Sequence, residues 1–243
     1  MKGSNNEQWS FLMIPMFHRD RSDSFVPSIA LQCWGFMAGS ALFALGSAPL
    51  VSERLGAIGA NLAFFVGSWF FTMAACIQLA SSGPPMVISQ QPAAHQQLAI
   101  RAIWLAAAVQ VLGTILFNIN TSEALSVYDV DDQRRLVWAP NADGSVAFLI
   151  SSILALVPLF RRRLYWAPRS VEWSGSWLNL LGSVAFAVSA VASIITPSGS
   201  VANAPVANLG TFTGAILFFA AAALGLRQSA DPAGGQGQED AHR

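Results

Sequence analysis

The chain has little charge. Only 11% of its 243 residues are Asp, Glu, Lys or Arg, and 53% are hydrophobic, whereas about 25% of the residues of a soluble globular domain are charged. The mean hydropathy is +0.48. This composition predicts a membrane protein. Its 13 basic and 13 acidic residues cancel, and no basic stripe with interleaved aromatic residues occurs, so we expect no nucleic-acid partner.

Cysteine and histidine are also scarce. Cys33 and Cys76 both lie in apolar runs, and two isolated cysteines make neither a disulfide framework nor a metal-binding spacing, so we interpret them as packed thiols. His18 and His95 have no partner at metal-ligand spacing, and we interpret the acidic stretch Asp129–Asp132 as a solvated loop rather than a cation site. No nucleotide, zinc-protease or serine-hydrolase motif occurs. We therefore expect no catalytic residue, no metal, no cofactor and no enzymatic activity.

Long apolar runs dominate what is present. A helix needs roughly 20 apolar residues to cross a bilayer, and six runs approach or reach this length. They are Val26–Leu50, Ile58–Ala80, Leu98–Asn120, Gly144–Phe160, Ser174–Thr196 and Val206–Leu226. The fold class predicted is an all-α, polytopic membrane helix bundle of six transmembrane helices.

The runs also divide the chain. We expect a cytoplasmic N-terminal segment over residues 1–25, in which Trp9–Phe17 is too short to span and fits an interfacial stretch. The six-helix transmembrane domain covers residues 26–226. Residues 227–243 are rich in Gly, Gln and charged residues, which predicts a disordered cytoplasmic tail.

The basic residues predict an orientation, because short cytoplasmic loops are enriched in Lys and Arg. With a cytoplasmic N-terminus, ten basic residues fall inside and three outside. Both termini should therefore be cytoplasmic, and the loop over residues 121–143 should lie outside. The inside set includes a cluster expected to contact anionic lipids at the cytoplasmic face, formed by Arg161, Arg162 and Arg163.

One short pattern recurs in every run. The pentapeptide Gly-Ser-Val-Ala-Phe occurs twice, and its relaxed form Gly-[Ser/Thr/Ala]-x-x-Phe occurs once in each of the six runs. Gly and Phe four residues apart share one helix face, and small residues mark close helix contacts in lipid. We interpret the pattern as a packing signature. Its leading glycines are Gly39, Gly67, Gly113, Gly144, Gly182 and Gly214.

Two further glycines lengthen the small-residue face of the first and sixth runs. They form the pairs Gly35-x-x-x-Gly39 and Gly210-x-x-x-Gly214. Two interpretations stay open, which are packing within one chain and a homodimer face on these helices. Pairing consecutive runs further predicts three repeated helical hairpins.

Polar residues inside the runs are uncharged. No Asp, Glu or His falls inside a run, which argues against a proton relay. The amides of Asn61, Gln110, Asn179 and Asn208 either hydrogen-bond between helices or line a cavity for a solute. The sequence therefore predicts an integral membrane protein with a structural, regulatory or accessory role. The alternative is a channel or transporter for a small uncharged or weakly polar solute.

The last two runs carry a resemblance to a known family. The segments 177–183 (WLNLLGS) and 208–214 (NLGTFTG) resemble the YrhK-like membrane proteins and longer actinobacterial multi-pass proteins that carry such hairpins. The resemblance implies a helical hairpin fold and a location in a bacterial cell membrane. It implies no catalytic or ligand-binding residue.

Overall fold

The structure is a computed structural model that describes residues 29–83, 94–126 and 128–230. The expected N-terminal segment with its interfacial stretch, residues 84–93 of the connector between the second and third runs, and the tail from residue 231 lie outside the described residues. The elements are α1 (Ile29–Ser47), α2 (Pro49–Ser81), α3 (Ala94–Glu123), α4 (Val130–Asp132), the π-helix η1 (Gln133–Trp138), α5 (Ala139–Arg161), α6 (Val171–Ala192) and α7 (Ala204–Ala230).

The predicted all-helical fold is confirmed. Six helices are long and apolar enough, by length and composition, to cross a membrane. Across the described residues no strand forms, and the β-type contact present is a single bridge between Ile195 and Val201, in the connection from α6 to α7.

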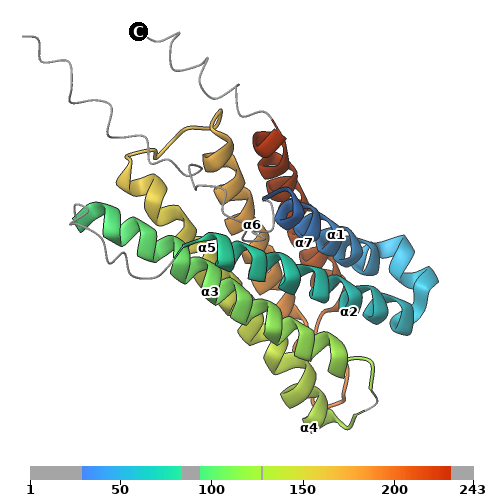
Figure 1. The fold of residues 1–243 in the computed structure, drawn as a ribbon. Helices are drawn as coiled ribbons and strands as arrows, with labels where there is room; N and C mark the ends of the chain where they lie inside the picture. The colour runs from blue at the N-terminus through green and yellow to red at the C-terminus, as the bar shows by residue number, and fades with distance from the viewer. Residues whose placement is uncertain (1–28, 84–93, 127, 231–243) are drawn as a thin grey trace, which may run out of the picture.

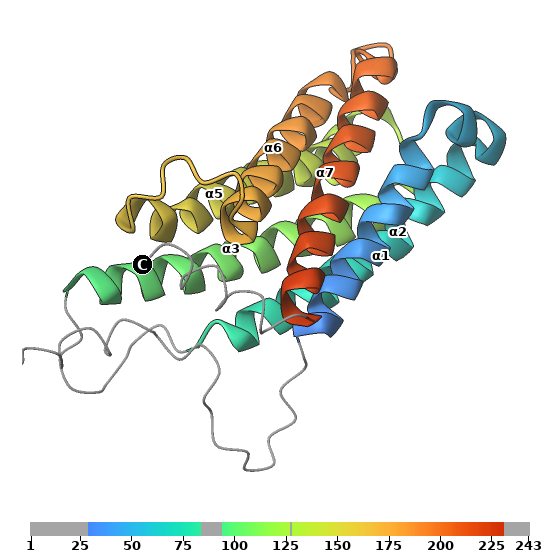
Figure 2. The same ribbon diagram turned by 90° about the horizontal axis from the view of Figure 1, so that it is seen from above.

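The six long helices close into a ring in which each packs against two neighbours. The closest pairs are α1 with α2, α3 with α5, and α6 with α7, and α7 completes the ring against α1 (Figure 1). The turns within these three pairs lie at one end of the bundle, which we call the loop end. The opposite end, where α5 finishes at Arg161, is called the arginine end (Figure 2).

Helix α2 starts earlier than the second run predicted. It begins at Pro49 and is interrupted at Gly56, whose φ of 67° lies in the left-handed region that favours glycine. Beyond this break it is continuous to Ser81. The predicted start at Ile58 therefore marks the point just after the break, because the first turns carry Glu53 and Arg54 and so do not read as an apolar run.

The fourth span also starts earlier than Gly144, and the predicted outer loop is largely helical. Asp129 caps α4 by accepting a hydrogen bond from the Asp132 backbone N–H at 2.9 Å. The chain then passes through η1 into α5 with helical backbone throughout, and Pro140, which has no N–H to donate, lies in the first turn of α5 directly after the π-helical segment. Sequence periodicity missed this segment because its charged residues resemble a loop. The last helix also ends later than predicted. Helix α7 continues to Ala230, whereas the last apolar run ends at Leu226.

The Gly and Phe residues of the recurring pattern exchange contacts within each close helix pair. A Cβ at Gly39 would stand 3.0 Å from the ring of Phe71, and one at Gly67 would stand 2.8 Å from the ring of Phe43. The same exchange joins Gly113 and Gly144 of α3 and α5 to Phe148 and Phe117, at 2.7 Å each. It also joins α6 to α7. Each glycine therefore makes room for the phenylalanine of its partner helix.

These phenylalanines meet in the centre of the bundle. All six are at most 4% exposed and form one cluster with Ala215. We call the six rings the phenylalanine core; they are Phe43, Phe71, Phe117, Phe148, Phe186 and Phe218. The residue after each leading glycine is buried as well, at 0 or 1% exposed, in Ser40, Ser68, Thr114, Ser145, Ser183 and Ala215.

The two extended small-residue faces are occupied inside the chain. A Cβ at Gly35 would stand 3.0 Å from Ala74 of α2, and one at Gly39 would stand 2.9 Å from the Gly67 carbonyl oxygen. A Cβ at Gly210 would stand 2.9 Å from the Ala185 carbonyl oxygen of α6. A homodimer contact on these faces would therefore have to displace a helix of the same chain.

Candidate functional site

The described residues form two cavities with polar groups in their linings, one on each side of the phenylalanine core. The loop-end cavity has a volume of about 230 Å³, and the arginine-end cavity about 100 Å³. Rings of the core form part of both walls, since Phe43, Phe117 and Phe186 line the first cavity and Phe218 lines the second. The core is therefore the partition between them.

The loop-end cavity takes its walls from all three helix pairs. The polar side chains of its lining are amides and hydroxyls, apart from the indole N–H of Trp138, and its apolar lining includes the aromatic rings of Phe64 and Trp138 beside the core. No Asp, Glu, Lys, Arg or His belongs to the described lining. The amides belong to Asn61, Asn120, Asn141 and Asn208.

The arginine-end cavity is smaller and is lined by the amides Gln78, Gln110 and Asn179 together with Ser151. The amide of Asn179 donates to Ser152 Oγ at 3.0 Å. Gln110 is 6% exposed. Since a water molecule occupies about 30 Å³ in the liquid, this cavity has the size of a few waters.

The four polar residues singled out in the sequence are therefore brought together two by two. Asn61 and Asn208 line the loop-end cavity, and Gln110 and Asn179 line the arginine-end cavity. Asn61 donates from Nδ2 to the Ala124 carbonyl oxygen at 2.8 Å, whereas the Asn208 side chain makes no hydrogen bond to any described residue. Lining and interhelical bonding thus coexist at Asn61.

Sequence reasoning missed Asn120 and Asn141 as lining residues. Asn120 donates to the Val137 carbonyl oxygen at 2.7 Å, and Asn141 donates to Ser193 Oγ at 3.1 Å. A signal did exist. Asn120 lies three residues beyond Phe117, and Asn141 three residues before Gly144, so both lie one turn from the packing motif on its loop-end side.

Hydrogen bonds across the loop end tie η1 and its flanks to α6 and the connection that follows it. The Trp138 indole N–H donates to the Ala190 carbonyl oxygen at 2.9 Å, and Arg134 Nε donates to the Ile195 carbonyl oxygen at 3.0 Å. Nearby, the Tyr128 hydroxyl donates to a Glu123 carboxylate oxygen. This hydrogen bond raises the pKa of Tyr128 above its ordinary value, because it favours the neutral phenol.

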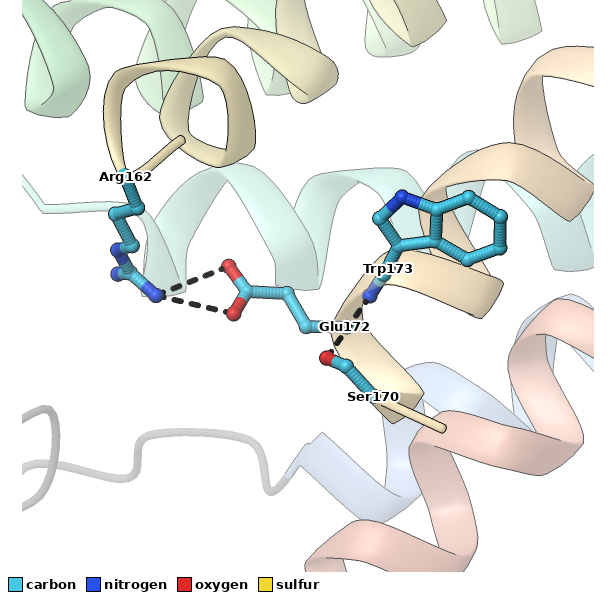
Figure 3. Close-up of polar contacts among 4 residues, drawn as sticks. All are labelled: Arg162, Ser170, Glu172 and Trp173. Atoms are coloured by element: carbon cyan, nitrogen blue, oxygen red, sulfur yellow. Dashed lines mark hydrogen bonds and ion pairs between the residues drawn. The ribbon is translucent and has the colours of Figure 1, made fainter. Parts of the chain in front are cut away.

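The arginine cluster lies in the connection between α5 and α6. Arg162 pairs with Glu172 at 3.0 Å, both side chains being partly exposed, and Ser170 caps α6 by accepting from the Trp173 N–H at 3.3 Å (Figure 3). Arg161 and Arg163 are exposed and have no ion-pair partner in the described part of the chain. The charge of Arg162 is thus partly offset, whereas its two neighbours present theirs to the surroundings.

The remaining reactive groups do not converge. Within residues 29–83, 94–126 and 128–230, no group of three His, Cys, Asp or Glu side chains is arranged to hold a metal ion. Cys33 is buried and Cys76 exposed, and both are free thiols. Of the acidic stretch, Asp129 caps α4 and Asp131 lies 3.6 Å from Arg134, so these carboxylates have structural partners.

The fold and the cavities define a protein with six helices of membrane-spanning length among the described residues and two cavities, each with amide groups in its lining, separated by aromatic rings. The profile of the YrhK-like protein family matches residues 138–198. The resemblance to this family is confirmed over these residues, although the matched segment starts at Trp138 and covers α5 and α6, earlier in the chain than expected; it contains residues 177–183 and ends before α7. No curated protein and no solved structure matches the chain.

Proposed function

We propose that the chain is a multi-pass protein of a bacterial cell membrane with a structural, regulatory or accessory role and no enzymatic activity. The observation that carries this proposal is the phenylalanine core. Six rings, each at most 4% exposed, fill the middle of the bundle between the two cavities. A bundle closed in this way suits a stable scaffold that acts through its surfaces and its cavities.

The distribution of side chains supports the membrane setting. Large apolar residues cover the outside of the helices, with Leu112 at 54%, Ile153 at 56% and Val191 at 66% exposed, while hydroxyls such as Ser152 and Ser183 are fully buried. A soluble protein rarely exposes apolar surface on this scale. In lipid, by contrast, hydroxyls bond between helices and apolar side chains face outward.

The basic residues support an orientation with both termini cytoplasmic. The exposed Arg161 and Arg163, together with Arg227 in the last turns of α7, belong to the arginine end, where an anionic inner leaflet would attract them. Reporter fusions test this. Alkaline phosphatase should be active when inserted at residue 199 and inactive when joined after Ala230, and the reverse pattern would refute the orientation.

The reciprocal contacts support the proposal of three repeated hairpins. Each close pair exchanges a Gly and a Phe in both directions, so alanine at the leading glycine of α1, α3 or α6 should destabilise the bundle to a similar degree. Unequal losses of stability among the three variants would indicate that the three helix pairs are not equivalent repeats.

The alternative of a channel or transporter for a small uncharged or weakly polar solute makes a different prediction. Two polar cavities on opposite sides of the core are suggestive of a path, yet a solute would have to part rings such as Phe117 and Phe148, stacked at a centroid distance of 5.0 Å. An apolar constriction of this kind excludes water. We therefore expect no conduction in this state.

Flux through proteoliposomes separates the two roles. Vesicles containing the protein should swell in glycerol and urea no faster than protein-free vesicles, with a glycerol-conducting channel as the positive control. Faster swelling that depends on the amount of protein would replace the accessory role with the channel or transporter.

A further inference from the structure

The loop-end cavity has a hydrogen-bonding pattern that selects a particular kind of ligand. Three of its four amides have fixed orientations. Asn61 and Asn120 each face a backbone carbonyl oxygen, which only accepts hydrogen bonds, so the amide nitrogen must point to it. Ser193 gives its hydrogen to the Ala190 carbonyl oxygen at 2.9 Å and therefore accepts from Asn141. The three Oδ1 atoms accept nothing from the described residues.

The other donors that line this cavity are already used. The Trp138 N–H and the Ser189 hydroxyl donate to carbonyl oxygens of α6 and α7, at 2.9 and 2.7 Å. Thr121 donates to the Phe117 carbonyl oxygen at 2.8 Å. Each of the three oriented amides keeps one further N–H, but its Oδ1 atom has two free lone pairs. The hydrogen-bonding capacity left over is therefore weighted toward acceptors, and a ligand satisfies it best by bringing donors.

The fourth amide belongs to Asn208. Asn208 is an exposed residue that lines the cavity, and its side chain makes no hydrogen bond to any described residue. The rings of Phe43, Phe117 and Phe186 line the same cavity. The cavity thus combines polar and aromatic groups in its lining, which suits a ligand with one polar and one apolar part.

The size of the cavity and the absence of charge in its described lining narrow the class of ligand further. An apolar cavity of about 150 Å³ holds benzene, so one of about 230 Å³ accommodates a molecule of roughly ten non-hydrogen atoms. No ionisable side chain belongs to the described lining, and a buried ion without a counter-charge is strongly disfavoured. An uncharged ligand fits and an ion does not.

We propose that the loop-end cavity is a binding site for a small, uncharged ring compound that carries O–H or N–H donors. Its ring packs against the phenylalanines, and its donors bond to the Oδ1 atoms of Asn61, Asn120 and Asn141, with Asn208 completing the polar contacts. This binding goes beyond the proposed accessory role and needs no passage through the core, so the flux measurement and a binding measurement fail independently.

Calorimetry with matched probes tests the site. Full-length protein in nanodiscs of uncharged lipid is titrated with phenol, with toluene, which replaces the hydroxyl by a methyl group, and with benzylammonium, which has donors and a charge. Empty nanodiscs correct for partitioning into lipid. Phenol should bind saturably at one site per chain, and toluene and benzylammonium should bind at least about tenfold more weakly.

Paired variants locate the binding. Asn208→Leu should weaken phenol binding about fivefold, as expected for one lost hydrogen bond, and Ala204→Phe should abolish it by filling the cavity. The matched changes Asn179→Leu and Ala155→Phe, in the arginine-end cavity, should leave it unchanged.

Three results would overturn the proposal. They are phenol binding no greater than that of empty nanodiscs, toluene or benzylammonium binding as tightly as phenol, and equal effects of the paired variants in the two cavities. Tryptophan fluorescence and gel filtration establish that each variant is folded. Because the Asn208 side chain has no hydrogen-bond partner among the described residues, its substitution keeps the test valid where the filling variant fails to fold.

Discussion

Phe218 of α7 packs its ring directly on the backbone of Gly182 in α6. A Cβ added at Gly182 would stand 2.5 Å from a ring carbon, closer than real Cβ atoms come. Because the ring is itself held in the phenylalanine core, it cannot easily move aside. The packing of this helix pair therefore requires a glycine at position 182, and the residue does not merely reflect the glycine-rich composition of apolar helices.

Alanine at Gly182 should therefore destabilise the protein by about 1–3 kcal/mol, the usual cost of overpacking. Gly175 of the same helix is the matched control, since a Cβ there meets nothing within 4 Å. Gly175→Ala should be neutral or stabilise by up to about 1 kcal/mol. SDS titration in mixed micelles, followed by tryptophan fluorescence, measures both. Equal effects at the two positions would contradict the reciprocal packing.

Two buried serines provide a second prediction. Ser152 Oγ lies 2.6 Å from Ser183 Oγ and accepts from Asn179, so Ser152→Ala removes the acceptor of the Asn179 amide and one of the two hydrogen-bond partners of the buried Ser183 hydroxyl. This change should cost about 1 kcal/mol or more. Ser40 is equally buried, at 0% exposed, and its hydroxyl has no hydrogen-bond partner among the described residues.

Ser40→Ala should therefore be neutral or stabilising. The same SDS titration measures both variants, and the comparison holds side-chain size and burial constant. If Ser40→Ala were as harmful as Ser152→Ala, the loss would reflect packing volume and not hydrogen bonding.

The contact between Tyr128 and Glu123 predicts a pH dependence. The hydrogen bond to Glu123 raises the pKa of Tyr128 above the ordinary 10.0. Its contribution to stability is therefore fully present below the unfolded pKa of about 10 and is lost as pH rises through the higher folded value.

Absorbance of the tyrosinate at alkaline pH measures this directly. The chain has two tyrosines, so Tyr165→Phe leaves Tyr128 as the reporting group. The titration midpoint should lie above 10 and fall when Glu123→Ala removes the acceptor. A midpoint that does not respond to Glu123→Ala would show that the contact is absent in solution.

Much of this architecture could be predicted from local sequence. The lengths of the apolar runs predicted six helices, and the recurring Gly and Phe lie where the helix pairs touch. The segment before Gly144 was missed because Asp131, Arg134 and Arg135 resemble a loop, although Asp129 caps a helix there. Periodicity detects apolar faces, whereas this segment is held by side-chain bonds to α6 and the residues that follow it.

The cavities could be predicted only in part. Asn61 and Asn208 were identified as polar residues within apolar runs, but their separation from Gln110 and Asn179 depends on where the phenylalanine rings meet. That meeting point follows from six helices packing together. A single sequence shows how many residues separate each amide from the Gly and Phe of its own helix. How the Gly and Phe residues of different helices align depends on the assembled bundle.

The arginine cluster yields the last prediction, which concerns anionic lipids. Each basic residue near an anionic surface contributes about 1 kcal/mol of attraction. Arg162 should contribute less than its neighbours, because Glu172 at 3.0 Å offsets its charge. Arg161→Gln and Arg163→Gln should each lower the retention of phosphatidylglycerol about fivefold, and Arg162→Gln should lower it less.

Native mass spectrometry of protein extracted from mixed phosphatidylglycerol and phosphatidylcholine vesicles measures this retention. Glu172→Gln is the informative control, since it removes the partner of Arg162 without touching the cluster (Figure 3). It should raise phosphatidylglycerol retention, and adding Arg162→Gln should cancel the gain. If all three arginine variants lost retention equally and Glu172→Gln changed nothing, the ion pair would not form at the lipid surface, and the three charges would act as one interchangeable patch.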